Sequence, residues 1–303
     1  MSPEPEARGF GPDIRRDYDT VRLAQQLFAK VWAPAEYVDA ELPTEAGPIP
    51  VRKFAPEERT GHHTLLFFHG GGWAIGSVDS YSRICASLAE ATGCPVWSVD
   101  YRLAPEHPFP APLDDCFHSA RAVLQNPGLV EANDPSEIVL VGDSAGANLA
   151  AVTSLLLRDE GVALPGAQIL FYPVTQTDHD LESSPFESVR EHGNRWFPRA
   201  VDLQGFVEMY APSDKGNWRV APLHAPNLRE QPRTLVISAG WDPLRDEGEA
   251  FGKALAAAGN DVRIERIERA LHGFLSLPRF ARPVSSSHDL VNDFLCSSVK
   301  MGS

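Results

Sequence analysis

The stretch Ile138–Gly146 reads IVLVGDSAG and passes from an apolar run into a series of small residues. Four consecutive apolar residues are typical of a strand buried on both faces. The pattern G-x-S-x-G between a strand and a helix places Ser144 at the tip of a sharp turn, where its hydroxyl projects from the sheet. Side chains at Gly142 and Gly146 would collide with the adjoining strand and helix. In this context the motif predicts that Ser144 is a nucleophile. The alternative is a glycine-rich turn whose serine only caps a helix, but the apolar strand before the turn favours the first interpretation.

Around this stretch, short apolar runs alternate with longer amphipathic segments. Short segments, most of them apolar throughout and bounded by Gly, Pro or Asp, predict strands over Thr64–Phe68, Pro95–Val99, Ile138–Val141, Gln168–Tyr172, Thr234–Ser238 and Val262–Ile267. Helices are predicted near residues 79–92, 112–125, 145–160, 246–258 and 285–298. This alternation indicates an α/β fold with a largely parallel sheet covered on both faces. A site is expected outside the carboxyl ends of its strands.

Two segments do not fit the alternation. Residues 15–32 have apolar residues at helical spacing before any predicted strand. Residues 176–220 separate two core strands by far more than an ordinary connection and are rich in aromatic residues. Such an insertion either covers the sheet or forms a lid over bound substrate, and the sequence leaves both open.

A glycine loop follows the strand Thr64–Phe68: residues 69–73 read HGGGW. Consecutive glycines let bare N–H groups approach a ligand closely. A flexible hinge or a phosphate loop is the alternative, but neither GxxxxGK[ST] nor GxGxxG is present here. Beside the Ser144 turn, the loop predicts an oxyanion hole in which the N–H groups of Gly71 and Gly72 meet that of Ala145. His69 is expected to be structural.

A serine hydroxyl needs a base, and a histidine base needs a carboxylate that orients it. His272 follows the strand Val262–Ile267 and is the best placed of ten histidines. Asp242 emerges just past Thr234–Ser238, whereas Asp246 and Glu247 begin the next helix, where acidic residues usually serve the helix start. We therefore predict Asp242 as the acid and Asp246 as its alternative. Seven other histidines are expected on the surface or in loops: His62, His63, His107, His179, His192, His224 and His288.

Composition excludes several classes of protein. The formal net charge of -14 disfavours binding to phosphate backbones and anionic lipid. No apolar run reaches the roughly 18–20 residues that span a bilayer, and the N-terminal residues lack the pattern of a secretory signal. Four scattered cysteines indicate reduced, buried thiols. We expect a cytoplasmic protein that binds neither nucleic acid nor membrane and needs no metal or organic cofactor.

As a set, five motifs resemble the α/β-hydrolase superfamily, specifically the bacterial hormone-sensitive-lipase-like carboxylesterases. They are HGGGW (69–73), DYRLAPEHPFP (100–110), GDSAGAN (142–148), DPLRDEG (242–248) and HGF (272–274). The resemblance implies an eight-stranded, mostly parallel sheet with flanking helices, in a single domain over 1–303. It also implies a helical cap from about 1–45 and 176–220, and a structural loop that holds Glu106 and a salt-bridged Arg102. Many members carry Gly where this chain has Ala147.

The resemblance further implies a serine carboxylesterase that hydrolyses short- to medium-chain esters through an acyl-enzyme. An amidase or N-deacetylase and a lactonase would use the same residues. A non-catalytic receptor is a different class, but such relatives tend to lose the histidine, and His272 is present. The expected partners are a small-molecule ester and, in a homodimer, a second copy of the chain. Residues expected to contact substrate are Trp73, Asp143, Tyr172, Trp196, Phe197 and Phe206.

Overall fold

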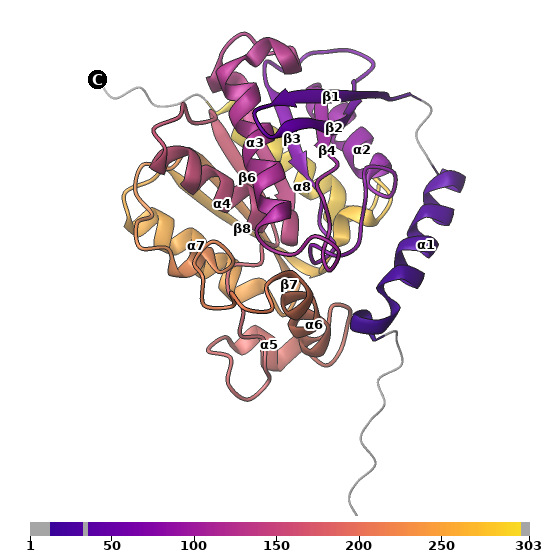
Figure 1. Ribbon diagram of the computed structural model, residues 1–303, viewed down its shortest axis with the longest axis vertical. Helices are drawn as coiled ribbons and strands as arrows, with labels where there is room; N and C mark the ends of the chain where they lie inside the picture. The colour runs from indigo at the N-terminus through magenta and orange to yellow at the C-terminus, as the bar shows by residue number, and fades with distance from the viewer. Residues whose placement is uncertain (1–12, 33–35, 298–303) are drawn as a thin grey trace, which may run out of the picture.

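A single eight-stranded sheet runs through the molecule in the order β1-β2-β4-β3-β5-β6-β7-β8 (Figure 1). The computed structural model describes residues 13–32 and 36–297. The hairpin β1–β2 is antiparallel and β2 is antiparallel to β4, whereas β3 to β8 pair in parallel. The mostly parallel eight-stranded sheet is thereby confirmed. The strands are β1 (Val38–Thr44), β2 (Gly47–Phe54), β3 (Thr64–Phe68), β4 (Val96–Val99), β5 (Ile138–Asp143), β6 (Ala167–Phe171), β7 (Arg233–Trp241) and β8 (Val262–Leu271).

The hairpin β1–β2 was not among the predicted strands. Its prolines argue against a strand, because proline is tolerated in a sheet only near an edge. In this hairpin, Pro43 lies opposite Pro48. The expected boundary of the cap needs a correction: residues 38–44 fall within 1–45, yet they form the edge strand of the sheet. Residues 1–12 and 33–35 of that range lie outside the described part of the chain.

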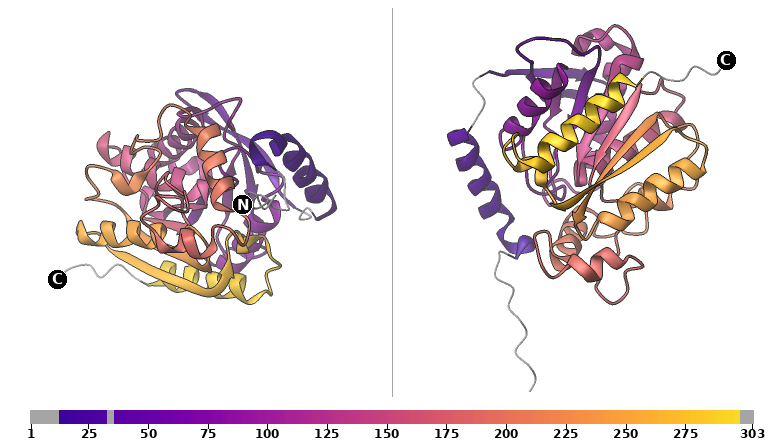
Figure 2. Two further views of the ribbon diagram at one scale, coloured as in Figure 1. Left: turned by 90° about the horizontal axis from the view of Figure 1, so that it is seen from below. Right: turned by 180° about the vertical axis from the view of Figure 1, so that it is seen from behind.

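Helices cover both faces of the sheet (Figures 1 and 2). The predicted helices are confirmed with small changes at their ends, as for α2, which ends before Gly93 because that residue adopts a left-handed φ of 64°. One face of the sheet carries α3, α4 and α7, and the other carries α2 and α8. Each face packs against its helices through an apolar cluster of its own. Their bounds are α1 (Ile14–Trp32), α2 (Ser82–Thr92), α3 (Ala111–Gln125), α4 (Ala145–Asp159), α7 (Arg245–Ala257) and α8 (Arg282–Cys296). Short 3-10 turns span Pro127–Val130, Pro135–Glu137, Pro222–His224 and Phe274–Ser276.

The long insertion between β6 and β7 holds two helices, α5 (Glu187–His192) and α6 (Ala200–Tyr210). Both lie at one end of the sheet (Figure 1). Helix α1 runs along the side of the molecule and reaches α6, where Arg15 pairs with Glu208 at 3.3 Å. The two segments that did not fit the strand–helix alternation are therefore neighbours in space.

The four cysteines are free thiols. Cys85, Cys94 and Cys116 are buried as expected, but Cys296 is exposed, since it ends α8 at the surface. Among the described residues, no helix is both long and apolar enough to cross a bilayer.

Candidate active site

Ser144 sits between β5 and α4 with φ 54° and ψ -120°, a backbone conformation that L residues rarely adopt. Close packing enforces the turn. A Cβ atom at Gly146 would lie 1.9 Å from the Phe68 carbonyl oxygen, and one at Gly142 would lie 2.3 Å from that of Gly146. The strand–turn–helix context expected of the motif is thus present, and its glycines are required for the reason given above.

Three side chains meet at the carboxyl ends of β5, β7 and β8. His272 places Nε2 2.9 Å from Ser144 Oγ and Nδ1 2.7 Å from Asp242 Oδ2. A carboxylate only accepts hydrogen bonds, so Nδ1 carries the proton and Nε2 is free to accept the serine hydroxyl. Asp242 is fully buried, and its Oδ1 accepts the Leu244 N–H at 2.9 Å.

The alternative acid, Asp246, does not reach the imidazole. Its carboxylate accepts hydrogen bonds from the Ser188 N–H and the Arg245 guanidinium instead. Of the two carboxylates, only that of Asp242 therefore hydrogen-bonds with His272 in the described part of the chain.

The glycine loop turns beside Ser144. Gly71 and Gly72 have φ angles of 110° and 58°, and a Cβ atom on either would lie 2.2 Å from a neighbouring atom, Ile75 O or Phe206 Cδ1. Within the described part of the chain, neither N–H group donates a hydrogen bond. Two bare donors are thus held in a conformation that only glycine readily adopts. Gly71, Gly72 and Ser144 all line one cavity.

Asp143 joins the serine turn to this loop. Its Oδ1 accepts the Gly70 N–H at 2.8 Å and its Oδ2 accepts the Tyr81 hydroxyl at 3.1 Å. Behind the loop, His69 donates from Nδ1 to the Gly70 carbonyl at 2.8 Å, and burial lowers the pKa of its imidazole to about 4. His69 is therefore neutral at pH 7 and supports the loop rather than contacting Ser144.

The buried Asp143 carboxyl makes stability depend on pH. Burial raises its pKa from 3.8 to about 6 in the folded chain. The folded protein thus binds this proton more tightly than the unfolded chain. The resulting contribution to the free energy of unfolding is complete below pH 3.8 and is lost as the pH rises through 6. A shift of about two units corresponds to about 3 kcal/mol.

An asparagine at position 143 does not titrate. We therefore expect wild type to lose about 3 kcal/mol of unfolding free energy relative to Asp143→Asn between about pH 4 and pH 7. Urea unfolding of both proteins across this range measures the difference. A difference that stays constant, or that grows in the opposite direction, would contradict the raised pKa.

A cavity of about 230 Å³ opens onto Ser144 and His272. Five of the six residues expected to contact substrate line it: Trp73, Asp143, Tyr172, Phe197 and Phe206. Trp196 is not part of the wall and is half exposed. Sequence reasoning missed Gln25, Val174, Leu203 and Val207, which reach the cavity from α1, from the segment after β6 and from α6. No motif marks these positions, because they meet only through tertiary packing.

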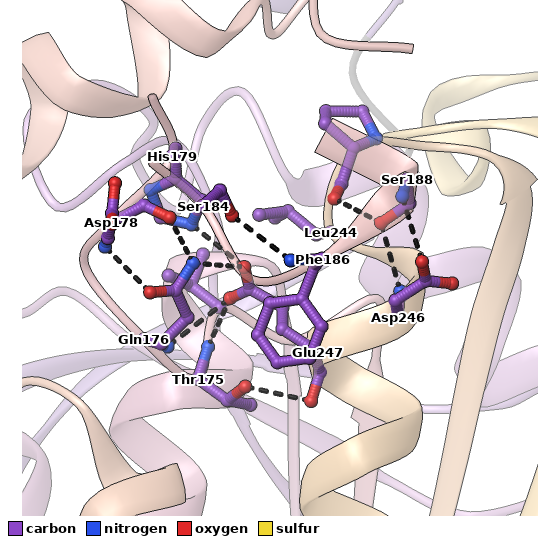
Figure 3. A network of polar contacts seen from close by, with 12 residues as sticks. Thr175, Gln176, Asp178, His179, Ser184, Phe186, Ser188, Leu244, Asp246 and Glu247 are labelled. Carbon is purple, nitrogen blue, oxygen red and sulfur yellow. Dashed lines mark hydrogen bonds and ion pairs between the residues drawn. The ribbon is translucent and has the colours of Figure 1, made fainter. Parts of the chain in front are cut away.

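Three of the histidines expected on the surface or in loops are buried: His179, which does lie in a loop, and His192 and His288, which lie in α5 and α8. His179 also lines the cavity, and its Nε2 lies 2.9 Å from Glu247 Oε2, with both side chains fully buried (Figure 3). The two residues are 68 positions apart, so no local pattern announced the pair. Within the described residues, no group of three or more His, Cys, Asp or Glu side chains could hold a metal ion.

The loop after β4 carries the expected ion pair. Arg102 binds Asp115 through Nη2 at 2.7 Å and through Nε at 2.8 Å. Glu106 accepts two hydrogen bonds from Arg22 of α1, so this loop also anchors the N-terminal helix. The structural role expected of both residues agrees with these contacts.

The sheet order, the strained serine turn and the Ser144–His272–Asp242 contacts define the class of α/β hydrolases. A family profile described as an alpha/beta hydrolase fold matches residues 65–276, more than half of the chain. The chain belongs to this family, and within it to the hormone-sensitive-lipase-like esterases.

Several relatives are similar over most of this chain. The carboxylic ester hydrolase LipN of Mycobacterium tuberculosis is 36% identical over 249 residues, which are 80% of this chain and 65% of that protein. An arylesterase of Saccharolobus solfataricus is also 36% identical, over 82% of this chain and 79% of its own. The solved structure of a hyperthermophilic esterase from the archaeon Pyrobaculum calidifontis matches with a TM-score of 0.83 at 32% identity, covering 96% of this chain and 93% of that one. The match to LipN spans just under two thirds of that relative.

Proposed function

We propose that this chain is a serine carboxylesterase with Ser144 as nucleophile, His272 as base and Asp242 as orienting acid. The observation that carries the proposal is His272, which contacts both Ser144 Oγ and Asp242 Oδ2 within hydrogen-bond distance. The relatives named as ester hydrolases support the choice of substrate class.

The reaction proceeds in two acyl transfers. His272 takes the Ser144 proton as Oγ attacks the ester carbonyl, and the N–H groups of Gly71, Gly72 and Ala145 stabilise the oxyanion. The protonated imidazole then gives its proton to the departing alcohol, which leaves an acyl-serine. Water, deprotonated by His272, attacks this ester, and the imidazolium returns the proton to Ser144 Oγ as the acid leaves.

The wall of the cavity suits uncharged esters of short to medium chain length. Its side chains are mostly apolar, with contributions from Val174, Leu203, Phe206 and Val207. Apolar walls favour alkyl and aryl groups over ions, since burying a charge without a partner is costly. We propose that Phe197 and Phe206 contact the substrate directly, together with Trp73 and Tyr172.

We further propose that one domain holds the site and that α1 together with residues 176–220 forms its cap. Phe197, Leu203 and Phe206 of this insertion and Gln25 of α1 line the cavity, which supports a role beyond covering the sheet. Three buried free thiols support a cytoplasmic location, where cysteines stay reduced. The homodimer stays a prediction that light scattering tests.

Turnover of matched substrates tests the function. We expect hydrolysis of p-nitrophenyl acetate and butyrate, slower hydrolysis of the octanoate because the cavity is small, and much slower cleavage of the matched butyryl p-nitroanilide. Faster cleavage of the anilide would favour an amidase, and preferential opening of a γ-lactone would favour a lactonase. Failure to turn over any of them would contradict an acyl-transfer enzyme.

A further inference from the structure

Two groups of hydrogen bonds tie the insertion after β6 to the first turn of α7 (Figure 3). In the first, the Glu247 carboxylate accepts from the Thr175 and Gln176 N–H groups and contacts His179. In the second, Ser188 of α5 contacts Pro243 and Asp246. The second group lies next to the acid of the site, because Pro243 follows Asp242 directly.

Ser188 makes three hydrogen bonds from a fully buried position. Its Oγ donates to the Pro243 carbonyl at 2.8 Å and accepts the Asp246 N–H at 3.2 Å. Its N–H donates to Asp246 Oδ2 at 2.8 Å. Both partners lie on the connection from β7 to α7 that carries Asp242.

Helix α7 lacks a cap of its own. Its N-cap residue, Leu244, supplies no side-chain hydrogen bond to the first turn, where N–H groups otherwise have no intrahelical partner. Ser188 accepts one of these N–H groups, as an N-cap serine would, although it is 58 positions away. The start of α7 is therefore fastened to the insertion and not only to its own chain.

Asp242 lies in the short turn between the end of β7 and the start of α7. Asp242 follows the last residue of β7, and its Oδ1 accepts the Leu244 N–H, one residue before α7 begins. Ser188 holds the Pro243 carbonyl inside this turn. A shift of this carbonyl and of the first turn of α7 would move Asp242 Oδ2 relative to His272 Nδ1, which lie 2.7 Å apart.

We propose that Ser188 is a positioning residue for the proposed reaction: from the insertion, it fixes the turn that aims Asp242 at His272. The inference rests on the proposed function and adds to it a second task for the insertion. Besides lining the cavity, the insertion completes the geometry of the triad. Small misplacements of reacting groups by distant residues are known to slow catalysis considerably.

The test compares Ser188→Ala with Ser184→Ala. Ser184 is buried in the same insertion, but within the described part of the chain its hydroxyl hydrogen-bonds only with the Phe186 N–H and not with residues 242–246. For Ser188→Ala we expect kcat for p-nitrophenyl butyrate to fall about tenfold, with KM within about twofold of wild type. For Ser184→Ala we expect kcat within about twofold of wild type. Urea unfolding of both variants shows how much stability each loses.

A spectroscopic signature separates positioning from a general structural defect. The proton between His272 Nδ1 and Asp242 gives a far-downfield proton resonance in NMR spectra. We expect it to move upfield or broaden in Ser188→Ala and to stay unchanged in Ser184→Ala. Ser188→Cys, which replaces the hydroxyl by a somewhat larger thiol that donates weakly, should give an intermediate kcat and provides the comparison if the alanine variant does not fold.

Equal kcat values in the two alanine variants, or an unchanged downfield resonance in Ser188→Ala, would overturn the inference. If Ser188→Ala does not fold and Ser188→Cys does, a kcat and a downfield resonance equal to those of wild type in Ser188→Cys would also overturn the inference. Absence of turnover in wild type is a separate result, because it removes the proposed function itself and this inference with it.

Discussion

Replacing Ser144 by alanine is expected to lower kcat/KM for p-nitrophenyl butyrate by about four to six powers of ten. Without Oγ no acyl-enzyme forms, and His272 has no hydroxyl to deprotonate at 2.9 Å. The residual rate would come from water held in the cavity beside the Gly71 and Gly72 donors. Initial rates over a wide range of enzyme concentration measure the loss.

Ser154→Ala is the matched control for this variant. Ser154 lies in α4, the helix that follows Ser144, and it is buried, with no hydrogen-bond partner for its hydroxyl in the described part of the chain. Its removal should leave kcat/KM within about twofold of wild type and stability nearly unchanged, since no hydrogen bond is lost. Hydrolysis by Ser144→Ala at the rate of this control would exclude Ser144 as the nucleophile.

Replacing Glu247 by alanine is expected to lower the free energy of unfolding by about 3–5 kcal/mol. The carboxylate is fully buried and accepts from four donors: the Thr175 and Gln176 N–H groups, the Gln176 amide and His179. Alanine leaves all four donors without this acceptor at buried positions. Against a total stability of about 5–15 kcal/mol, such a loss is large. Urea unfolding monitored by tryptophan fluorescence measures it.

Glu247→Gln and Glu182→Ala separate loss of the buried hydrogen-bond acceptor from the general effect of removing an acidic side chain. The glutamine keeps an oxygen for the two backbone N–H groups and should lose less stability than the alanine. Glu182 is an exposed residue of the insertion that carries His179, and its replacement should change stability by no more than about 0.5 kcal/mol. An effect of Glu247→Ala as small as that of Glu182→Ala would show that the network contributes little.

The sequence predicted the parts of this protein that short motifs encode. A nucleophile turn needs a strand, two glycines and the start of a helix in close succession, and Ile138–Gly146 supplies all of them within nine residues. His272 and Asp242 could be expected to lie close together because the ends of parallel strands meet at one edge of a sheet. The strands β3 to β7 were visible as largely apolar runs, whereas β8, at the edge of the sheet, mixes apolar with charged residues.

What escaped prediction depends on contacts between distant segments. The hairpin β1–β2 lies at the sheet edge, where strands need neither a continuous apolar run nor an absence of proline. Glu247 looked like an ordinary acidic residue in a first helical turn, and His179 looked like a loop residue, because each acquires its role from the other. The same holds for Ser188, whose partners lie more than 50 positions further along the chain.

We propose that catalysis passes through a covalent bond between Ser144 Oγ and the acyl group of an ester. Labelling with a p-nitrophenyl alkylphosphonate tests it most directly, because attack by Oγ on phosphorus expels p-nitrophenolate and leaves a stable adduct. We predict one adduct per chain by intact mass, located by peptide mapping on Ser144, together with complete loss of esterase activity and no adduct in Ser144→Ala. An adduct on another residue, or full inactivation of wild type with Ser144 unmodified, would contradict the account.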